Sequence, residues 1–122
     1  NAVGAEARNV PNAGQAAWHC YSLAMWYHRR SDPAQTIRWG KLSQRSDMQW
    51  QPREVCVSLL LAMARHRTGE TEEARKLLAD AAKLVGAVMD PSTGKWSDNL
   101  DAWVDWMNAH ILLTEAEAMI GG

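Results

Sequence analysis

The chain has 122 residues, a length that fits one domain and suffices to bury a core. Its 13 basic and 14 acidic residues nearly cancel, which argues against nucleic acid as a partner. No apolar run approaches the roughly 20 residues that cross a bilayer, so we expect no membrane insertion.

The first half of the chain is predicted to form a helical hairpin. Apolar residues recur at helical spacing over residues 15–30. Asp32 is a favoured N-cap and Pro33 is tolerated at the first helical position, so a second helix is predicted over residues 33–45.

Residues 53–86 are predicted to form a second hairpin. Gly69 is expected to end its first helix, because only glycine enters the left-handed conformation without steric cost. Thr71 is expected to cap the second helix, whose acidic first turn suits the positive helix end and which should run to about Val85.

The two hairpins share a pattern at a constant offset of 38 residues. Leu23-Ala24-Met25 and His28-Arg29 recur as Leu61-Ala62-Met63 and His66-Arg67. This predicts an internal repeat of helical hairpins.

The second helices of the two hairpins align less well. The turn at residues 31–33 is expected to be shorter than the turn at residues 69–71, which makes the first copy a looser match. In the first copy Thr36 and Gly40 replace Ala74 and Leu78.

A long helix is predicted over residues 98–120, capped by Ser97 or Asp98. Trp50 is expected to cover the core between the hairpins, and Trp96 to anchor the loop before the long helix. The helix carries so broad an apolar stripe that we expect the preceding helices to cover it, as they would a terminal capping helix. The stripe contains Leu100, Trp103, Val104, Met107, Ile111 and Thr114, widened by Trp106, His110 and Leu113.

The second hairpin resembles a tetratricopeptide repeat, a unit of about 34 residues built as helix, turn, helix. This resemblance implies an all-α fold of about five helices, with two antiparallel hairpins and the capping helix. We divide the chain into a flexible lead, 1–14, and one domain, 15–122, with hairpins at 15–45 and 53–86 and a capping helix at 98–120. The resemblance rests on Leu61, Ala62, Gly69, Ala74, Leu78 and Ala81.

The same resemblance implies that the first helix of each hairpin lines a concave, partner-binding side. Each selected stripe is apolar and ends in a His-Arg pair, which suits a peptide with hydrophobic side chains and an acidic residue held by Arg29 and Arg67. The alternative is that the long C-terminal helix or a neighbouring domain fills this groove. The candidate residues are Trp18, Tyr21, Ser22, Met25, His28 and Arg29, and Cys56, Leu59, Leu60, Met63, His66 and Arg67.

The second half also resembles helical regions at the C-terminal end of large planctomycetal, hence bacterial, proteins, including serine/threonine kinases and WD40-repeat proteins. We expect the chain to be the end of such a longer protein. No kinase signature is present, so kinase activity is not implied. The similarity rests on residues 61–64, 66–67, 69, 73–75, 78, 96 and 115–118.

No motif for catalysis, a metal or a cofactor stands out. Cys20 and Cys56 make no C-x-x-C pair and are expected to be buried free thiols, which fits a reducing compartment such as the cytoplasm. The histidines lack ligand spacing. We therefore expect a non-catalytic interaction or scaffold module that binds a protein or peptide. The alternative is a small accessory domain with a ligand pocket lined by some of its seven Trp and six Met.

Overall fold

The computed structural model describes residues 13–45, 50–89 and 100–121. These residues form five α-helices and no strand, which confirms the predicted all-α class. The helices are α2 (Ala13–Arg29), α3 (Pro33–Gln44), α4 (Gln51–Arg67), α5 (Thr71–Met89) and α6 (Leu100–Ile120).

Several predicted boundaries shift. The first helix begins at Ala13, so it includes the last two residues of the expected lead. The helix α5 continues past Gly86 to Met89, because Val85 is buried and Val88 packs against the core. The remaining lead, the caps at Ser97 and Asp98, and Trp96 lie outside the described residues.

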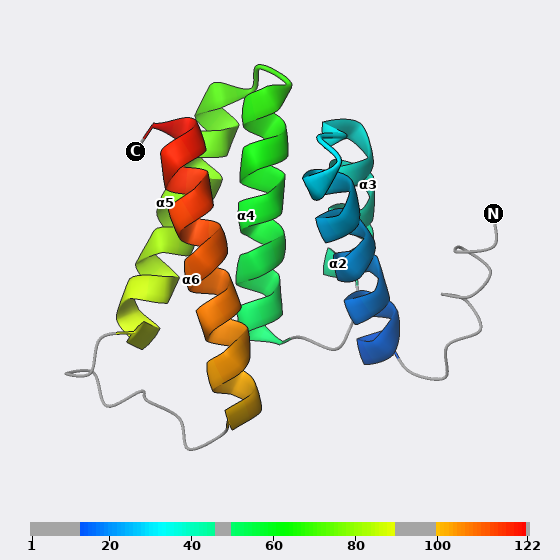
Figure 1. Ribbon diagram of the computed structural model, residues 1–122, viewed down its shortest axis with the longest axis vertical. Coiled ribbons are helices and arrows are strands. Elements are labelled where there is room, and N and C mark those ends of the chain that lie inside the picture. Colours follow the sequence, from blue (N-terminus) through cyan, green and yellow to red (C-terminus); the bar gives the residue numbers. More distant parts are fainter. Residues whose placement is uncertain (1–12, 46–49, 90–99, 122) are drawn as a thin grey trace.

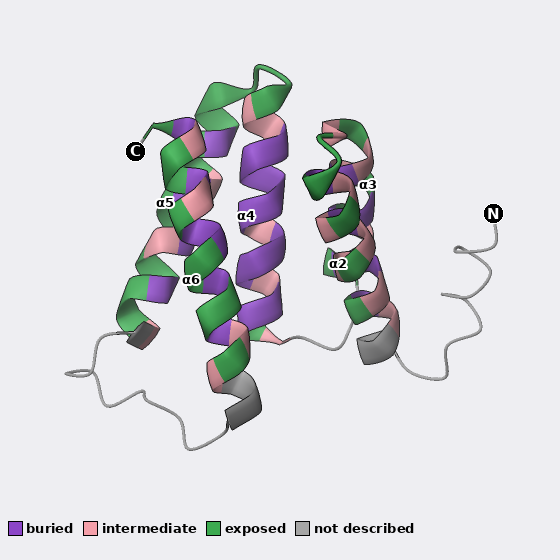
Figure 2. Cartoon of the chain, in the orientation of Figure 1, coloured by how far each residue is buried: buried purple, intermediate pink, exposed green. Residues whose placement is uncertain are grey.

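The helix α4 lies in the middle of the molecule (Figure 1). The pair α2 and α3 packs on one side of it, and α5 and α6 pack on the other. Buried residues run along almost the whole length of α4, from Pro52 to Ala64 (Figure 2). The first helix of the second hairpin is therefore the core element of the domain.

The first hairpin turns through Ser31, which adopts the left-handed conformation with φ of 58°. The Ser31 N–H donates to the His28 carbonyl at 3.0 Å, and the Asp32 N–H donates to the Tyr27 carbonyl at 3.0 Å. These two bonds form a Schellman motif, which satisfies the last carbonyls of α2.

The second hairpin turns in the same way at positions 38 residues further on. Gly69 has φ of 90°, and its N–H donates to the His66 carbonyl at 3.1 Å. The Glu70 N–H donates to the Arg65 carbonyl at 2.8 Å. The expectation of a shorter first turn is therefore wrong, because Ser31 takes the glycine conformation and no residue is missing.

The N-caps confirm one prediction and correct another. Asp32 caps α3, accepting a hydrogen bond from the Gln35 N–H at 3.2 Å, and Pro33 opens that helix as expected. Thr71, however, is already the first residue of α5, and the carbonyl of Glu70 accepts from the Ala74 N–H at 3.0 Å. The capping position therefore belongs to Glu70.

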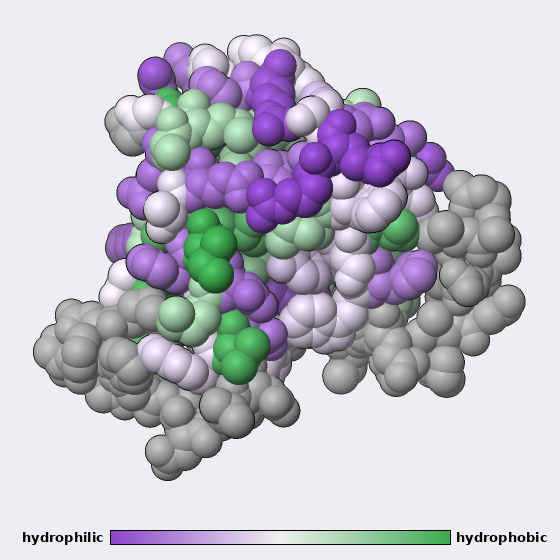
Figure 3. All heavy atoms as spheres, viewed as in Figure 1, coloured by the Kyte–Doolittle hydropathy of each residue, from purple (hydrophilic) through white to green (hydrophobic). Residues whose placement is uncertain are grey.

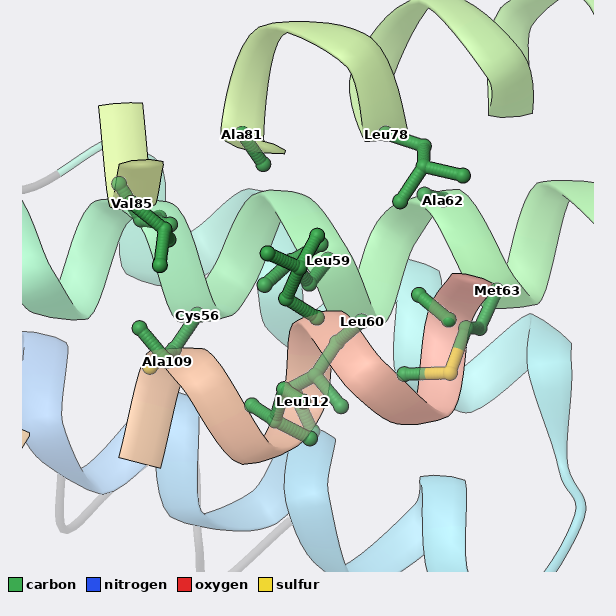
Figure 4. Packing of buried hydrophobic residues seen from close by; sticks show 14 of the residues in the cluster. Cys56, Leu59, Leu60, Ala62, Met63, Leu78, Ala81, Val85, Ala109 and Leu112 are labelled. Atoms are coloured by element: carbon green, nitrogen blue, oxygen red, sulfur yellow. The ribbon is translucent and has the colours of Figure 1, made fainter. Parts of the chain in front are cut away.

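The main core joins α4, α5 and α6. Leu59, Leu60 and Met63 of α4 are fully enclosed between the other two helices. Ala62 and Ala109 are small enough to let these helices approach closely. Figure 4 shows Leu78, Ala81 and Val85 of α5 and Ala109 and Leu112 of α6 packed on α4.

The helix α3 approaches α4 through a glycine. A Cβ atom on Gly40 would lie 2.9 Å from Leu61 Cδ2, so only glycine fits without a shift. Nearby, the buried Ser43 hydroxyl donates to the Ala17 carbonyl at 2.9 Å, which ties α3 to α2. The first hairpin is thus held by close backbone approach and a buried polar bond.

The helix α6 buries only part of the stripe predicted for it, at Trp106 and Leu113, together with residues on the other side of the helix. Of the stripe expected to be covered, Val104, Met107, Ile111 and Thr114 are exposed. The other side of the helix packs instead, because Ala109 and Ala116 allow close contact with α4 and α5. The buried residues of α6 are Trp106, Ala109, Leu112, Leu113, Ala116 and Ile120.

Candidate interaction surface

The ends of α2 and α6 are joined by a three-residue clasp. His28 Nε2 donates to Glu115 Oε2 at 2.6 Å, since a carboxylate only accepts, and Arg29 Nη1 donates to Glu115 Oε1 at 2.8 Å. The His28 side chain is buried, whereas that of Arg29 is half exposed. Burial of Glu115 acts to raise its pKa, but the hydrogen bonds from His28 and Arg29 outweigh it and the pKa is lowered. The clasp therefore holds a carboxylate of the same chain, whereas the sequence predicted that Arg29 would hold an acidic residue of a bound peptide.

Further polar contacts link α6 and α2 to the start of α4. Trp50 Nε1 donates to Asp105 Oδ2 at 2.7 Å, so Trp50, half-buried, ties α4 to α6. The hydroxyl of Tyr21 donates to the Cys56 thiol, and burial raises the pKa of both groups, that of Cys56 to about 11. These groups are neutral structural contacts at physiological pH.

Apart from Trp18, which is 37% exposed, the apolar part of the predicted first-helix stripe belongs to the core. Met63 is completely buried, and Tyr21 and Met25 are half-buried against the core cluster. The part of the groove that α4 was expected to line is covered by α6, which packs directly on α4. Among the other members of the stripe, Cys56, Leu59 and Leu60 are also buried.

The second copy of the His-Arg pair is arranged differently from the first. Arg67 is exposed, and among the described residues no ion pair joins it to a carboxylate. His66 is half-buried. The neighbouring Arg65 Nη1 instead binds Glu70 Oε2 at 2.9 Å, and hydrogen bonds from Arg65 and Thr68 lower the pKa of Glu70. Within the described part of the chain, only the first pair therefore forms an ion pair with α6.

The sequence prediction missed an exposed apolar stripe on α6. The exposed fractions are 51% for Val104, 38% for Met107 and 56% for Ile111. Thr114 and Ala118 extend the same row, and both are exposed. The spacing of three and four residues places all five on one helix face. Figure 3 shows strongly hydrophobic side chains on this part of the surface. The signal was present in the sequence, but it was read as a buried face.

The described residues do not favour a ligand pocket lined by Trp and Met. A hollow of ≈ 150 Å³ lies between α4 and α5, and its lining contains neither residue type. Small-molecule sites usually enclose about 300–1,000 Å³. The exposed tryptophans Trp18 and Trp26 lie on α2, away from this hollow.

The same described segments show neither a metal-binding cluster nor a membrane-spanning helix. They contain no group of three or more His, Cys, Asp or Glu able to hold a metal ion. None of their helices is long and apolar enough to cross a membrane. Cys20 and Cys56 are free, buried thiols.

Comparison with known proteins adds no relative to this chain. No protein-family model, no curated protein and no solved structure matches it. The resemblance to tetratricopeptide hairpins and to planctomycetal tails therefore stays a prediction from residues.

Proposed function

We propose that this chain is a non-catalytic helical interaction module that binds a helix of a protein partner through the outer face of α6. The observation that carries the proposal is the exposed row formed by Val104, Met107 and Ile111, each more than a third exposed. Contiguous apolar residues on a surface are typical of a protein-binding site. The inner face of α6 is already packed on the core, so this row does not stabilise the fold.

A row of the same spacing on α4 supports a helix as the occupant. Val104, Met107 and Ile111 are the fifth, eighth and twelfth residues of α6, and the same places in α4 hold Val55, Ser58 and Ala62. Val55 and Ser58 line the hollow against α5, and Ala62 lies beneath Leu78 of α5 (Figure 4). A row of this spacing on α4 is therefore covered by an antiparallel helix, α5.

The charges of α6 indicate the chemistry of that helix. Its sequence contains Asp101, Asp105, Glu115 and Glu117 and no Lys or Arg. Glu117 is exposed beside the apolar row. Because opposite charges at the rim steer association, an amphipathic helix with Lys or Arg beside its apolar face fits best.

The sequence also predicted an interaction module, but it placed the binding surface on the first helices of the hairpins. The proposal places it on the outer face of α6. The first-helix stripe supplies core residues and the clasp, while α6 supplies the exposed apolar side chains. A partner that reaches Arg29 must also accommodate Glu115, which that arginine already binds.

A site-specific photocrosslinker tests the proposal. We would place it at Ile111 and, as a matched exposed control, at Arg75 on α5, and irradiate each protein in extract of the source cells. The proposal predicts a discrete protein adduct at position 111 that is weak or missing at position 75.

Substitution then tests whether the captured protein binds this face. Ile111→Glu should abolish binding of the purified partner, whereas His110→Glu, an exposed change of the same kind on the same helix, should leave it within about twofold. Equal adducts at positions 111 and 75, or equal binding by both variants, would refute the proposal. Circular dichroism checks that both variants are folded.

A further inference from the structure

Building on the proposed function, we infer that the helix received by α6 is α2 of a second copy of this chain. Two copies would form a closed, two-fold dimer in which the outer face of each α6 packs on the outer face of the other copy's α2. The first argument is the surface of α2, which carries its own exposed aromatic row. Trp18 and Trp26 are 37% and 56% exposed, with the exposed Ser22 between them.

The charges of the two helices are complementary. The helix α2 contains no Asp or Glu and ends in His28 and Arg29, followed directly by Arg30. The guanidinium of Arg30 lies 4.6 Å from the centroid of the Trp26 ring, so the basic group borders the aromatic row. The helix α6 contains no Lys or Arg and four acidic residues, of which Glu115 already binds His28 and Arg29 and Glu117 is exposed. A basic aromatic row and an acidic aliphatic row therefore face solvent on the same molecule.

The spacing of the two rows also matches. Trp26 lies eight positions after Trp18, and Ile111 lies seven positions after Val104. At about 1.5 Å per residue, these rows are about 12 Å and about 10.5 Å long. When the helices run parallel, Arg30 near the end of α2 faces Glu117 near the end of α6. The apolar rows then lie against each other over their full length.

The arrangement of the helices permits a closed dimer. In Figure 1, α2 and α6 lie on either side of α4, in front of α3 and α5, and both run upward from their N-terminal ends. A two-fold axis parallel to these helices brings α6 over α2 of the other copy and α2 over its α6. The helix contact then forms twice, which helps reach the roughly 1,200–2,000 Å² of stable interfaces. A perpendicular axis would instead place acidic α6 on acidic α6.

Sedimentation velocity over a range of concentrations tests the dimer. The wild-type protein should reach twice its 13.6 kDa mass and no more, and high salt should weaken the association. Ile111→Glu and Trp26→Glu should each give monomers, because each change removes one side of the contact. His110→Glu should dimerise as the wild type does.

A charge exchange makes the test independent of these apolar substitutions. At low salt, Arg30→Glu and Glu117→Arg should each weaken the dimer by about threefold to tenfold. The double variant Arg30→Glu, Glu117→Arg should recover most of the wild-type affinity. No recovery in the double variant would overturn the inferred pairing.

Other outcomes separate the dimer from the proposed function. If Trp26→Glu still dimerises and Ile111→Glu does not, α6 packs on α6 of the other copy. Masses above that of a dimer would indicate an open chain of copies. Either result overturns the inference. A wild-type monomer whose Ile111 crosslinks to a different protein overturns the dimer and leaves the interaction module standing. A monomer whose Ile111 yields no specific adduct overturns both.

Discussion

The two hairpins turn identically but hold their second helices in different ways. Both turns are Schellman motifs that place the next helix after the same number of residues. In the second hairpin, Leu78 of α5 packs on Ala62 of α4. At the equivalent place in the first hairpin, Gly40 brings α3 close not to its own partner α2 but to Leu61 of α4, the first helix of the next hairpin.

The difference shows that a shared turn does not determine helix packing. The turn sets where the second helix starts, whereas the side-chain volume one turn or two later sets its distance from α4. A leucine there fills the interface with apolar surface, and a glycine replaces that surface with close backbone approach. The copies are therefore repeats in connection and not in core composition.

The largest expected effect comes from making the second hairpin like the first. Leu78→Gly removes a side chain that is only 7% exposed and places glycine inside a helix. The cavity and the helix cost together should lower the free energy of unfolding by about 3–5 kcal/mol. Urea unfolding followed by circular dichroism measures this value.

Leu84→Gly is the matched control for that prediction. Leu84 lies on the same helix and is 41% exposed, so its loss should cost mainly helix propensity, about 1 kcal/mol. Equal losses for the two variants would show that Leu78 does not fill the interface as the structure indicates.

The reverse exchange should also destabilise, though less. In Gly40→Leu the added Cβ meets Leu61 Cδ2 at 2.9 Å and Val57 Cγ1 at 3.5 Å. Overpacking should outweigh the gain in helix propensity and lower the free energy of unfolding by about 2 kcal/mol. Gly86→Leu has open space around its Cβ and should raise it by about 0.5 kcal/mol. Thermal unfolding of both variants tests this prediction, because Gly40→Leu should lower the unfolding temperature and Gly86→Leu should raise it.

The clasp that joins the first hairpin to α6 has a pH-dependent effect. Glu115→Gln should lower the free energy of unfolding at pH 7 by about 1 kcal/mol, a modest value because Arg29 is half exposed. The pKa of Glu115 is depressed in the folded protein: burial opposes the shift, and the hydrogen bonds from His28 and Arg29 prevail. The stabilisation is therefore complete above the usual carboxyl pKa of about 4.5 and disappears as pH falls through the folded value.

Unfolding midpoints measured from pH 7 to pH 3 test this sign. The difference between wild type and Glu115→Gln should shrink toward pH 3. Glu117→Gln, an exposed change on the same helix, should stay within about 0.5 kcal/mol of wild type at pH 7. A difference that grows on acidification would contradict the assignment of the clasp.

Local features of the sequence were enough to predict the helices and turns. Pro33 and Asp32 start α3, and Gly69 ends α4, because their backbone preferences act within a few residues. The offset of 38 residues also relates the two turns, at Ser31 and Gly69, that share one geometry. The length of the first turn was misjudged because Ser31 occupies a conformation that sequence reasoning reserves for glycine.

Long-range features were not predictable in the same way. Both faces of α6 are apolar, and the sequence prediction gave more weight to Val104 and Ile111 than to Ala109 and Ala116. The face that contains the small residues is the buried one, because small side chains let α6 lie closer to α4 and α5. The clasp joins His28 to a residue 87 positions away, so the sequence predicted a bound peptide's carboxylate for Arg29 and did not identify Glu115.

The smallest expected effect lies in the turn itself, where the hairpins are most alike. Ser31→Gly should raise the free energy of unfolding by about 0.5–1 kcal/mol, because φ of 58° is costly for serine and not for glycine. Gly69→Ser should lower it by a similar amount, since φ of 90° suits serine less well still. Differential scanning calorimetry resolves such shifts.

Ser22→Gly shows whether glycine stabilises only at the turn. Ser22 lies within α2, where its hydroxyl donates to the Trp18 carbonyl at 2.9 Å, so glycine there should cost about 0.5 kcal/mol. Opposite signs at positions 22 and 31 would locate the gain in the left-handed residue. A loss at both positions would mean that the Ser31 side chain stabilises the turn more than its backbone strain destabilises it, and the two turns would then share geometry for different physical reasons.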